Sequence, residues 1–257
     1  MNTLVFDIET IPDIESGKKL YDLSGSNAEI AEKMREIRRN ESNGSDFMRH
    51  HLHKIVVISA VLDSHNKIKV WSLGEKDSSE KELISRFFEG IEKYSPTLVS
   101  WNGAGFDLPV LHYRALVNGV VAPRYWEMGE EDASFKWNNY LNRYHYRHMD
   151  LMDILSCYQA KASARLDEIA TMMDFPGKMG MDGSKVLDAY LNGEIEAIRN
   201  YCETDVLNTY LVYLRFEVMR GKLSHANYET KINTLKKLLV SSQQPHLDEF
   251  LNAWQSK

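Results

Sequence analysis

The sequence has 257 residues, of which 43% are hydrophobic and 26% are charged, which is typical of a globular protein with a sizeable core. Its formal net charge of −6 excludes a surface that is basic overall, but it leaves room for a local basic strip. No apolar stretch reaches the length of a membrane span and the N-terminus lacks a signal-peptide pattern, so we expect no membrane association and a cytoplasmic location.

Five segments have the pattern of β-strands. They are residues 3–8, 54–62, 67–73, 97–101 and 148–151. The second of them, Lys-Ile-Val-Val-Ile-Ser-Ala-Val-Leu, is the strongest because β-branched residues dominate it. Asn66 lies between the second and third segments, so we predict a hairpin turn there.

Apolar residues at helical spacing predict helices between and after these strands. The predicted helices cover residues 27–40, 79–94, 107–118, 194–220 and 228–254, with short helices after residue 151. Residues 124–147 are rich in Tyr, Trp, Asn and Arg and show no period, so we predict a loop.

Strands come first and helices are interleaved, which predicts an α/β fold with a mixed central sheet flanked by helices. We expect one principal domain over residues 1–220 and a helical extension over residues 221–257 that packs on it. Residues 13–53 form an insertion that is too long for a simple connection between the first two strands. Long connections of this kind are usually functional or mobile.

Three distant fragments carry acidic residues in a related setting. They are Leu-Val-Phe-Asp-Ile-Glu-Thr at residues 4–10, Asn-Gly-Ala-Gly-Phe-Asp at 102–107, and Tyr-Cys-Glu-Thr-Asp at 201–205. Asp7 and Glu9 end an apolar strand and share one face of it, because side chains at i and i+2 do. Tyr201 and Asp205 share a helical face, because they are four residues apart.

Each fragment alone also has an ordinary structural interpretation. The acidic pair could simply terminate a strand, Asp107 could cap a helix after a glycine-containing loop, and Tyr201 with Asp205 could lie on a plain helix surface. However, adjacent carboxylates repel one another unless a cation lies between them. The occurrence of all three fragments, in order and on suitable elements, favours the chemical interpretation.

These residue types suit phosphodiester hydrolysis with two divalent ions roughly 4 Å apart. Mg²⁺ or Mn²⁺ prefers hard oxygen ligands, which carboxylates supply. Asp7 would bridge both ions, Glu9 and Asp205 would complete the site of one ion, and Asp107 would hold the other. Tyr201 would orient the attacking water, because a phenol with a reference pKa near 10 is a poor base at neutral pH.

The three fragments resemble the exonuclease motifs of the DEDD 3′–5′ exonucleases, in the tyrosine-containing branch that includes the proofreading domains of family B DNA polymerases. The sequence is most similar to the stand-alone, PolB-like predicted 3′–5′ exonucleases of bacteria. This resemblance spans about residues 1–220 and implies a ribonuclease H-like fold. It also implies removal of nucleoside monophosphates from the free 3′ end of nucleic acid, with single-stranded DNA as the expected substrate.

Several neighbouring residues are candidates for nucleic-acid contacts. Asn102 could bind the terminal sugar or base, and Phe106 could stack on a base, although core packing is the more ordinary role for Phe106. Thr10 and Ile11 directly follow the acidic pair, at a position that the resemblance places beside the terminal nucleotide. Lys178, in a glycine-rich loop, either delivers an ammonium to a phosphate or is a solvated loop residue.

Other patterns have weaker interpretations. The loop around Lys178 lacks Walker A spacing, which excludes nucleoside triphosphate binding by that motif. Residues 49–54, Arg-His-His-Leu-His-Lys, have no cysteine or acid at ligand spacing, so a basic strip explains them better than zinc. Cys157 and Cys202 have no CxxC partner, which argues against a disulfide framework. Asp150 is either a helix cap or, as the resemblance implies, a supporting group beside the site.

Two alternatives to DNA hydrolysis remain at this point. The same chemistry could act on RNA or short oligoribonucleotides, since backbone hydrolysis needs no base-specific groups. A module that binds nucleic acid without catalysis is the alternative from another class. Loss of one acidic residue would have favoured that module, and all four are present.

Overall fold

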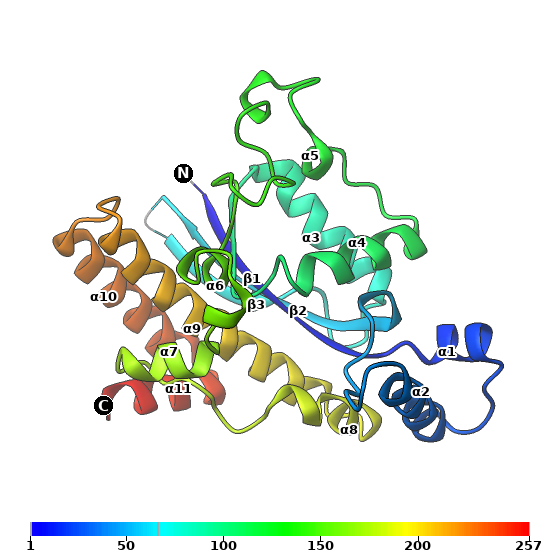
Figure 1. Ribbon diagram of the computed structural model, residues 1–257. Helices are drawn as coiled ribbons and strands as arrows, with labels where there is room; N and C mark the ends of the chain where they lie inside the picture. The colour runs from blue at the N-terminus through cyan, green and yellow to red at the C-terminus, as the bar shows by residue number, and fades with distance from the viewer. Residues whose placement is uncertain (1, 66, 257) are drawn as a thin grey trace.

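The computed structural model describes residues 2–65 and 67–256. At its centre lies a sheet with strand order β3-β2-β1-β4-β5 (Figure 1). Its strands are β1 (Thr3–Pro12), β2 (His53–Ser64), β3 (Lys67–Ser72), β4 (Thr97–Ser100) and β5 (His148–Asp150). The pairings of β3 with β2 and of β2 with β1 are antiparallel, whereas β4 and β5 extend the sheet parallel to β1. The predicted mixed α/β sheet is confirmed, and the predicted Asn66 turn lies outside the described residues.

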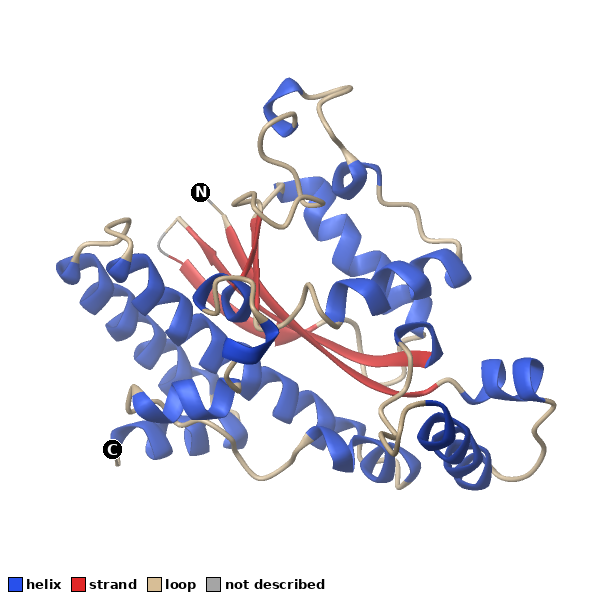
Figure 2. Ribbon diagram, in the orientation of Figure 1, coloured by secondary structure: helices blue, strands red, loops and turns tan. Residues whose placement is uncertain are grey.

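Helices cover both faces of the sheet (Figure 2). They are α1 (Ile14–Tyr21), α2 (Asn27–Glu41), α3 (Glu80–Tyr94), α4 (Asp107–Asn118), α5 (Pro123–Trp126), α6 (Leu151–Leu155), α7 (Leu166–Met172), α8 (Val186–Leu191), α9 (Ile195–Met219), α10 (His225–Ser242) and α11 (Pro245–Gln255). None of the helices in the described part of the chain combines the length and apolar character that a membrane-spanning helix needs.

Side-chain alternation along β1 gives the sheet two different faces. Phe6 and Ile8 join the core formed with α3 and α4. Val5 points to the opposite face and belongs to the core that contains Tyr210 of α9. Asp7 and Glu9 follow Val5 at intervals of two residues, so β1 directs them toward the α9 face.

β1 is much longer than its parallel neighbour β4. The two strands pair only from Thr3 opposite Thr97 to Val5 opposite Val99, while β2 accompanies β1 as far as Pro12. Beyond Val5, the edge of β1 on the β4 side is therefore open. Groups from other elements can reach the backbone of β1 at this edge.

The insertion over residues 13–53 is folded and its two ends lie together. Its helix α2 begins with a capping box formed by Ser26 and Glu29. The backbone N–H of Asp13 donates to the carbonyl of Leu52 at 2.7 Å. The insertion therefore leaves β1 and returns to β2 at the same place, with α1 and α2 projecting from the sheet (Figure 1).

The region 124–147 contains more structure than the predicted loop. Residues 124–126 lie in α5, and residues 133–135 form a 3₁₀ turn. Tyr125, Phe135 and Tyr140 are buried, and the Arg147 guanidinium lies 3.8 Å from the Phe135 ring centroid. These aromatic residues belong to the core but are irregularly spaced in the sequence, which explains why the sequence shows no helical or strand periodicity here.

The C-terminal region is two helices rather than the single predicted helix over 228–254. α10 ends before Gln243, whose φ of 55° is left-handed, and α11 begins with Pro245. Proline has no N–H to continue the hydrogen-bond ladder of α10 but suits the first turn of a new helix. Pro245 is therefore the residue in the sequence that marks this division.

Arg114 of α4 joins the start of the insertion to α3. Its guanidinium pairs with Asp13 and, at 2.6 Å, with Glu80, and all three side chains are at most 7% exposed. Glu80 also accepts a hydrogen bond from the backbone N–H of Ile55 at 2.7 Å. One buried cation thus balances two buried carboxylates and links three elements.

Replacing Arg114 with methionine should destabilise the protein strongly. The substitution keeps much of the apolar stem but leaves Asp13 and Glu80 buried without a cation, which costs about 3–5 kcal/mol. Urea denaturation at pH 7.5 measures the free energy of unfolding. The control is Arg86→Met, because Arg86 forms an exposed i,i+4 pair with Glu82 and its loss should cost less than about 1 kcal/mol. Equal effects of the two substitutions would contradict this account.

Candidate active site

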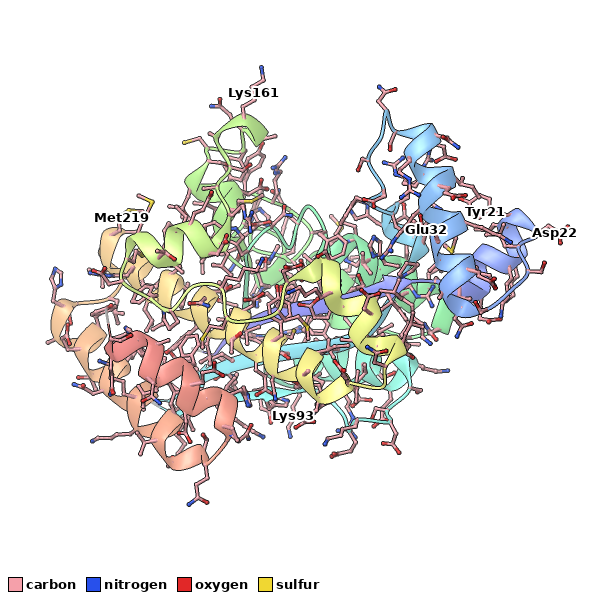
Figure 3. All side chains as sticks on the ribbon, turned by 90° about the horizontal axis from the view of Figure 1, so that it is seen from below. Tyr21, Asp22, Glu32, Lys93, Lys161 and Met219 are labelled. Carbon is pink, nitrogen blue, oxygen red and sulfur yellow. The ribbon has the colours of Figure 1, made fainter. Side chains whose placement is uncertain are left out.

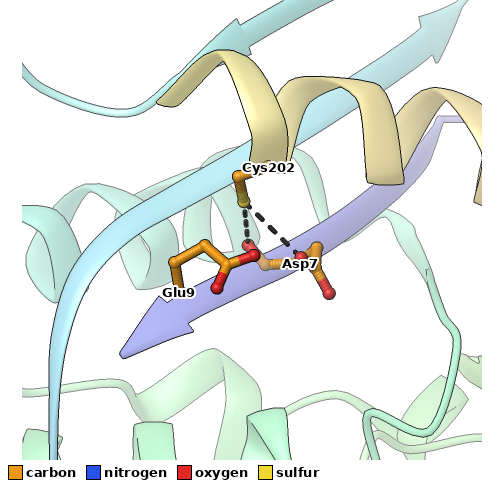
Figure 4. A group of neighbouring side chains, drawn as sticks. All are labelled: Asp7, Glu9 and Cys202. Carbon is orange, nitrogen blue, oxygen red and sulfur yellow. Dashed lines mark hydrogen bonds between the residues drawn. The ribbon is translucent and has the colours of Figure 1, made fainter. Parts of the chain in front are cut away.

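Asp7 and Glu9 lie side by side on the α9 face of β1 (Figure 4). Each offers a carboxylate oxygen that lies, together with the Cys202 sulfur, in a group whose atoms are all within 4.8 Å of one another. Burial raises the pKa of both carboxyl groups well above their usual range, and the negative charges of neighbouring carboxylates raise these pKa values further. The pair is thus arranged as the i and i+2 spacing predicts.

Asp107 is joined to β1 by a direct hydrogen bond. Its Oδ1 accepts from the backbone N–H of Ile8 at 3.1 Å, at the edge that β4 leaves open. Its side chain does not cap α4, because the N-cap residue is Phe106 and Asp107 is the first helical residue. Asp107 is 3% exposed, and burial, with a contribution from the Asp150 charge, raises its pKa to about 7.

Tyr201 and Asp205 come from α9, and the charge of Asp205 raises the pKa values of Asp7 and Glu9. Burial raises the pKa of Asp205 to about 6, while Tyr201 and Lys178 favour its ionised form. Burial and the negative charges of Asp205, Glu9 and Asp7 raise the pKa of the Tyr201 phenol. Tyr201 therefore remains a neutral hydrogen-bonding group at neutral pH.

Cys202, to which sequence analysis assigned no role, forms hydrogen bonds with Asp7. Its thiol donates to the backbone carbonyl and to Oδ2 of Asp7, both at 3.6 Å (Figure 4). Burial and the charge of Asp7 raise the pKa of the thiol well above its usual range, so it keeps its proton. Its position, next to Tyr201 and three residues before Asp205, places it on the side of α9 that faces β1.

The loop that carries Asn102 and Phe106 is held by Asp150. The Asp150 carboxylate accepts from the backbone N–H groups of Asn102 and Ala104 at 2.9 and 2.8 Å. It also accepts from the N–H groups of Met152 and Asp153, which caps α6. Both interpretations of Asp150 therefore describe the structure.

Close approach explains a glycine in this loop. A Cβ atom at Gly103 would lie 2.3 Å from the Ser100 hydroxyl, and Ser100 ends β4. A larger residue would push the loop away from the sheet and from Asp150.

Lys178 is brought to the site by Asn208, which sequence analysis also missed. Asn208 is 1% exposed and binds the backbone of Gly177 twice, accepting from its N–H at 3.1 Å and donating to its carbonyl at 2.8 Å. Lys178 itself is partly exposed, lies 3.5 Å from Asp182 and favours ionisation of Asp205. Asn208 is three residues after Asp205 on α9, and this spacing could have identified it.

Two cavities are lined by three of the four carboxylates, whereas Asp107 lines neither of them. The larger, about 750 Å³, contains five of the predicted residues: Asp7, Asn102, Lys178, Tyr201 and Asp205. The smaller, about 530 Å³, contains three others: Glu9, Thr10 and Phe106. Ile11 lines neither cavity, because it is 4% exposed and packs in the core with Val57 and α8. The structure therefore does not offer Ile11 for the contact with nucleic acid that we expected.

The acidic cluster has the donor set that a hard divalent cation requires. In residues 2–65 and 67–256, no Lys, Arg or His nitrogen lies within ion-pairing distance of Asp7, Glu9, Asp107 or Asp205. The charges of Asp107 and Asp205 raise the pKa of both Asp7 and Glu9. Carboxylate oxygens are the ligands that Mg²⁺ and Mn²⁺ prefer. The residues present thus fit divalent cations.

In the absence of divalent cations, the stability of the protein should fall as the pH rises from about 4 to 7. Asp107 and Asp205 have folded-state pKa values near 7 and 6, above an unfolded value of about 3.9. In this window the folded state binds more protons than the unfolded state, so each group lowers the stability by up to about 1.4 kcal/mol for every rise of one in pH. Thermal unfolding in EDTA at pH 5 to 8 measures the loss, and MgCl₂ at pH 7.5 should restore stability.

In the variant Asp107→Asn, stability should fall less steeply with rising pH, because the substitution removes one of the two groups with a raised pKa. Asp248→Asn, at an exposed position of α11, is the matched control and should leave the pH dependence unchanged. A melting temperature in EDTA that rises between pH 4 and 7 would contradict the raised pKa values of these carboxyl groups in the folded protein.

Comparison with known proteins agrees with this geometry. Residues 45–254 match the family described as a predicted 3′–5′ exonuclease related to the exonuclease domain of PolB. The match includes the fragments with Asp107 and Asp205 and begins after Asp7 and Glu9.

Individual relatives are DNA polymerases. The DNA polymerase epsilon catalytic subunit from Emericella nidulans is 26% identical over 147 residues, which are 54% of this chain and 6% of the polymerase. The corresponding polymerase from Aspergillus fumigatus gives the same identity and coverage. This chain therefore matches only a small part of each relative.

The fold is shared with a solved structure. The family B DNA polymerase from the archaeon Pyrobaculum calidifontis superposes with a TM-score of 0.50 at 18% identity, over 93% of this chain and 28% of the polymerase. This likeness and the mixed sheet identify a ribonuclease H-like fold. The match over residues 45–254 shows that the chain belongs to the family of predicted 3′–5′ exonucleases related to the exonuclease domain of PolB.

Proposed function

We propose that this protein is a metal-dependent exonuclease that hydrolyses single-stranded DNA from its free 3′ end and releases nucleoside monophosphates. The observation that carries the proposal is the convergence of four carboxylates from β1, α4 and α9. None of them forms an ion pair with a basic residue in the described part of the chain. Membership of the exonuclease family supports the reaction class. The metal requirement, the substrate and the products are part of the proposal.

Asp7, Glu9, Asp107 and Asp205 are the residues that would hold two divalent ions. Such ions neutralise charge on the phosphate and lower the pKa of a bound water. Without cations, the acidic cluster would repel a phosphodiester. The substrate can therefore bind only where the carboxylates would hold the ions. Their rigid attachment to a strand and two helices favours one geometry.

The remaining residues would orient the reactants. The neutral Tyr201 phenol can donate a hydrogen bond to, or accept one from, the attacking water without removing its proton. Lys178 can place a positive charge on a phosphate oxygen from the loop that Asn208 anchors. The Asn102–Phe106 loop, which Asp150 fixes, can close around the 3′-terminal nucleotide.

Digestion of labelled oligonucleotides tests the function. Single-stranded DNA with a 5′ label should shorten stepwise with Mg²⁺ or Mn²⁺ and stay intact in EDTA, and a 3′-phosphate should slow the reaction. Asp7→Ala and Asp205→Ala should abolish cleavage while the proteins stay folded, whereas Asp248→Ala should cleave normally. RNA of the same sequence tests the choice of sugar.

Cleavage in EDTA, normal rates in either acidic variant, or nicking of circular single strands at a comparable rate would overturn the proposal. The first two results would remove the metal-dependent mechanism. The last would remove the requirement for a 3′ end.

Tyr201→Phe should slow cleavage without weakening metal binding. The change removes the hydroxyl that would orient water and keeps the ring, so packing should survive. We expect the single-turnover rate to fall about 10–1000-fold, which corresponds to about 1.4–4 kcal/mol of transition-state stabilisation. A Mn²⁺ titration of both proteins separates this role from metal ligation, and Tyr190→Phe in α8 is the control. If the rate and the metal affinity fall together, Tyr201 is a ligand and our assignment is wrong.

A further inference from the structure

The insertion supplies one wall of the smaller cavity beside Glu9. On one side the cavity is bounded by β1, including Glu9 and Thr10, and by Phe106. On the other side it is bounded by the insertion, through Arg35 and Phe47 among others. Residues that are remote in sequence from all three acidic fragments therefore lie next to the carboxylates.

Phe47 presents a large aromatic surface in this cavity. It is 55% exposed, although its ring centroid lies only 5.5 Å from that of Phe106 and 5.4 Å from that of His53. An exposed phenylalanine at the edge of an aromatic cluster has a free ring face on which another flat group can stack.

The position of Phe47 is fixed by α2. The Arg38 side chain donates to the Phe47 carbonyl at 2.8 Å, and Arg39 lies 3.7 Å from Asp46. A ring on a backbone held in this way loses little further freedom when it binds a ligand. The arginines of α2 therefore serve as a scaffold for the exposed ring.

The same wall is tied to the strand that carries Glu9. The Thr10 hydroxyl and His53 Nδ1 are 2.8 Å apart, and His53 Nε2 lies 3.2 Å from the Met48 carbonyl. Burial lowers the pKa of His53 to about 4, so the ring is neutral and can accept from Thr10 while it donates to Met48. This chain of contacts sets the distance between the Phe47 wall and the acidic pair.

Arg35 adds a cation to the cavity. Its guanidinium lies 3.8 Å from Glu32, which is beyond hydrogen-bond distance, and its side chain is 31% exposed. Arg38 and Arg39, in contrast, make hydrogen bonds of 2.8 and 2.5 Å. Arg35 is therefore the arginine of α2 that can most readily turn to an anionic ligand.

The two cavities meet at the carboxylates. Gly183 lines both of them, Asp7 lines the larger, and Glu9 lines the smaller. A strand whose reacting phosphate lay between Asp7 and Glu9 would have its longer portion in the larger cavity and its last nucleotide in the smaller. In the view from below, α2 with Glu32 and the turn with Lys161 project as two separate parts of the molecule (Figure 3).

We propose that the insertion forms a stacking subsite in which Phe47 contacts the base of the 3′-terminal nucleotide and Arg35 supplies positive charge beside its sugar–phosphate. This inference rests on the proposed exonuclease function and deepens it by naming the residues that would bind the terminal nucleotide. A paired terminal base is held by hydrogen bonds to the opposite strand, and these would have to break before the base could enter the cavity beside Phe47, so the subsite requires an unpaired 3′ end. The insertion thereby selects single-stranded ends.

A cycle that changes both the protein and the substrate tests the subsite. Wild type and Phe47→Ala are compared on two single-stranded DNA oligomers, one with a normal 3′-terminal nucleotide and one whose terminal nucleotide is abasic. In single-turnover cleavage, Phe47→Ala should raise the half-saturating enzyme concentration about 5–150-fold on the normal end. It should change that concentration little on the abasic end, because the base that would stack is missing.

Two further variants complete the cycle. Phe47→Tyr keeps the ring and should behave as wild type. Tyr94→Ala removes a ring of similar exposure, 46%, at the end of α3. It should leave the half-saturating enzyme concentration unchanged on both substrates. Equal weakening on both substrates would show that Phe47 acts only on the structure, and no weakening on the normal end would show that no base stacks there. Either result overturns the subsite.

A binding measurement separates this inference from the proposed function. Asp205→Asn protein is mixed with DNA that carries 2-aminopurine at the 3′ end, and stacking on Phe47 should quench its fluorescence. The quench should be lost when Phe47→Ala is added to the same protein. If wild-type protein leaves DNA intact while the Phe47-dependent quench persists, the exonuclease proposal falls and the subsite stands. If DNA is degraded from the 3′ end but neither readout depends on Phe47, only the subsite falls.

Discussion

Crowding of negative charge in a buried place is the constraint on which the rest of this structure depends. The charges of Asp107 and Asp205 raise the pKa values of Asp7 and Glu9, and no basic residue in the described part of the chain forms an ion pair with any of these four carboxylates. Such a cluster is stable only with protons or cations bound to it. The fold around it must therefore hold the carboxylates in place against their own repulsion, and the arrangement of β1, α4 and α9 does so.

The early end of β4 makes this arrangement possible. If β4 paired with β1 beyond Val5, the backbone N–H of Ile8 would face a neighbouring strand and could not donate to Asp107. Because this edge is open, the first residue of α4 can form a hydrogen bond with the backbone of β1. Asp150 and Asn208 then fix the adjoining loops through hydrogen bonds to backbone groups.

The sequence was most informative where local geometry alone determines proximity. The spacing of Asp7 and Glu9 on a strand, and of Tyr201 and Asp205 on a helix, follows from the periods of those elements. The hydrogen bond of Asp107 to Ile8 joins residues 99 positions apart, and no local pattern encodes it. The contact of Asn208 with Gly177 and the position of Phe47 depend on the paths of a loop and of the insertion. Ile11, adjacent to the predicted contact Thr10, packs in the core with Val57 and α8, which no local pattern encodes.

The C-terminal helices are connected to the same site by polar contacts. His246 of α11 lies 2.9 Å from Glu203, which also accepts from the Ser72 hydroxyl at 2.7 Å, and Ser72 lies 2.8 Å from Ser59. Ser59 is the residue opposite Asp7 in the pairing of β1 with β2. Because a buried carboxylate such as Glu203 is costly without partners, α11 stabilises the stretch of α9 that carries the acidic site. The site is therefore held from two sides, because the insertion is bonded to β1 through Thr10 and His53 and the last helix is bonded to α9 through His246 and Glu203.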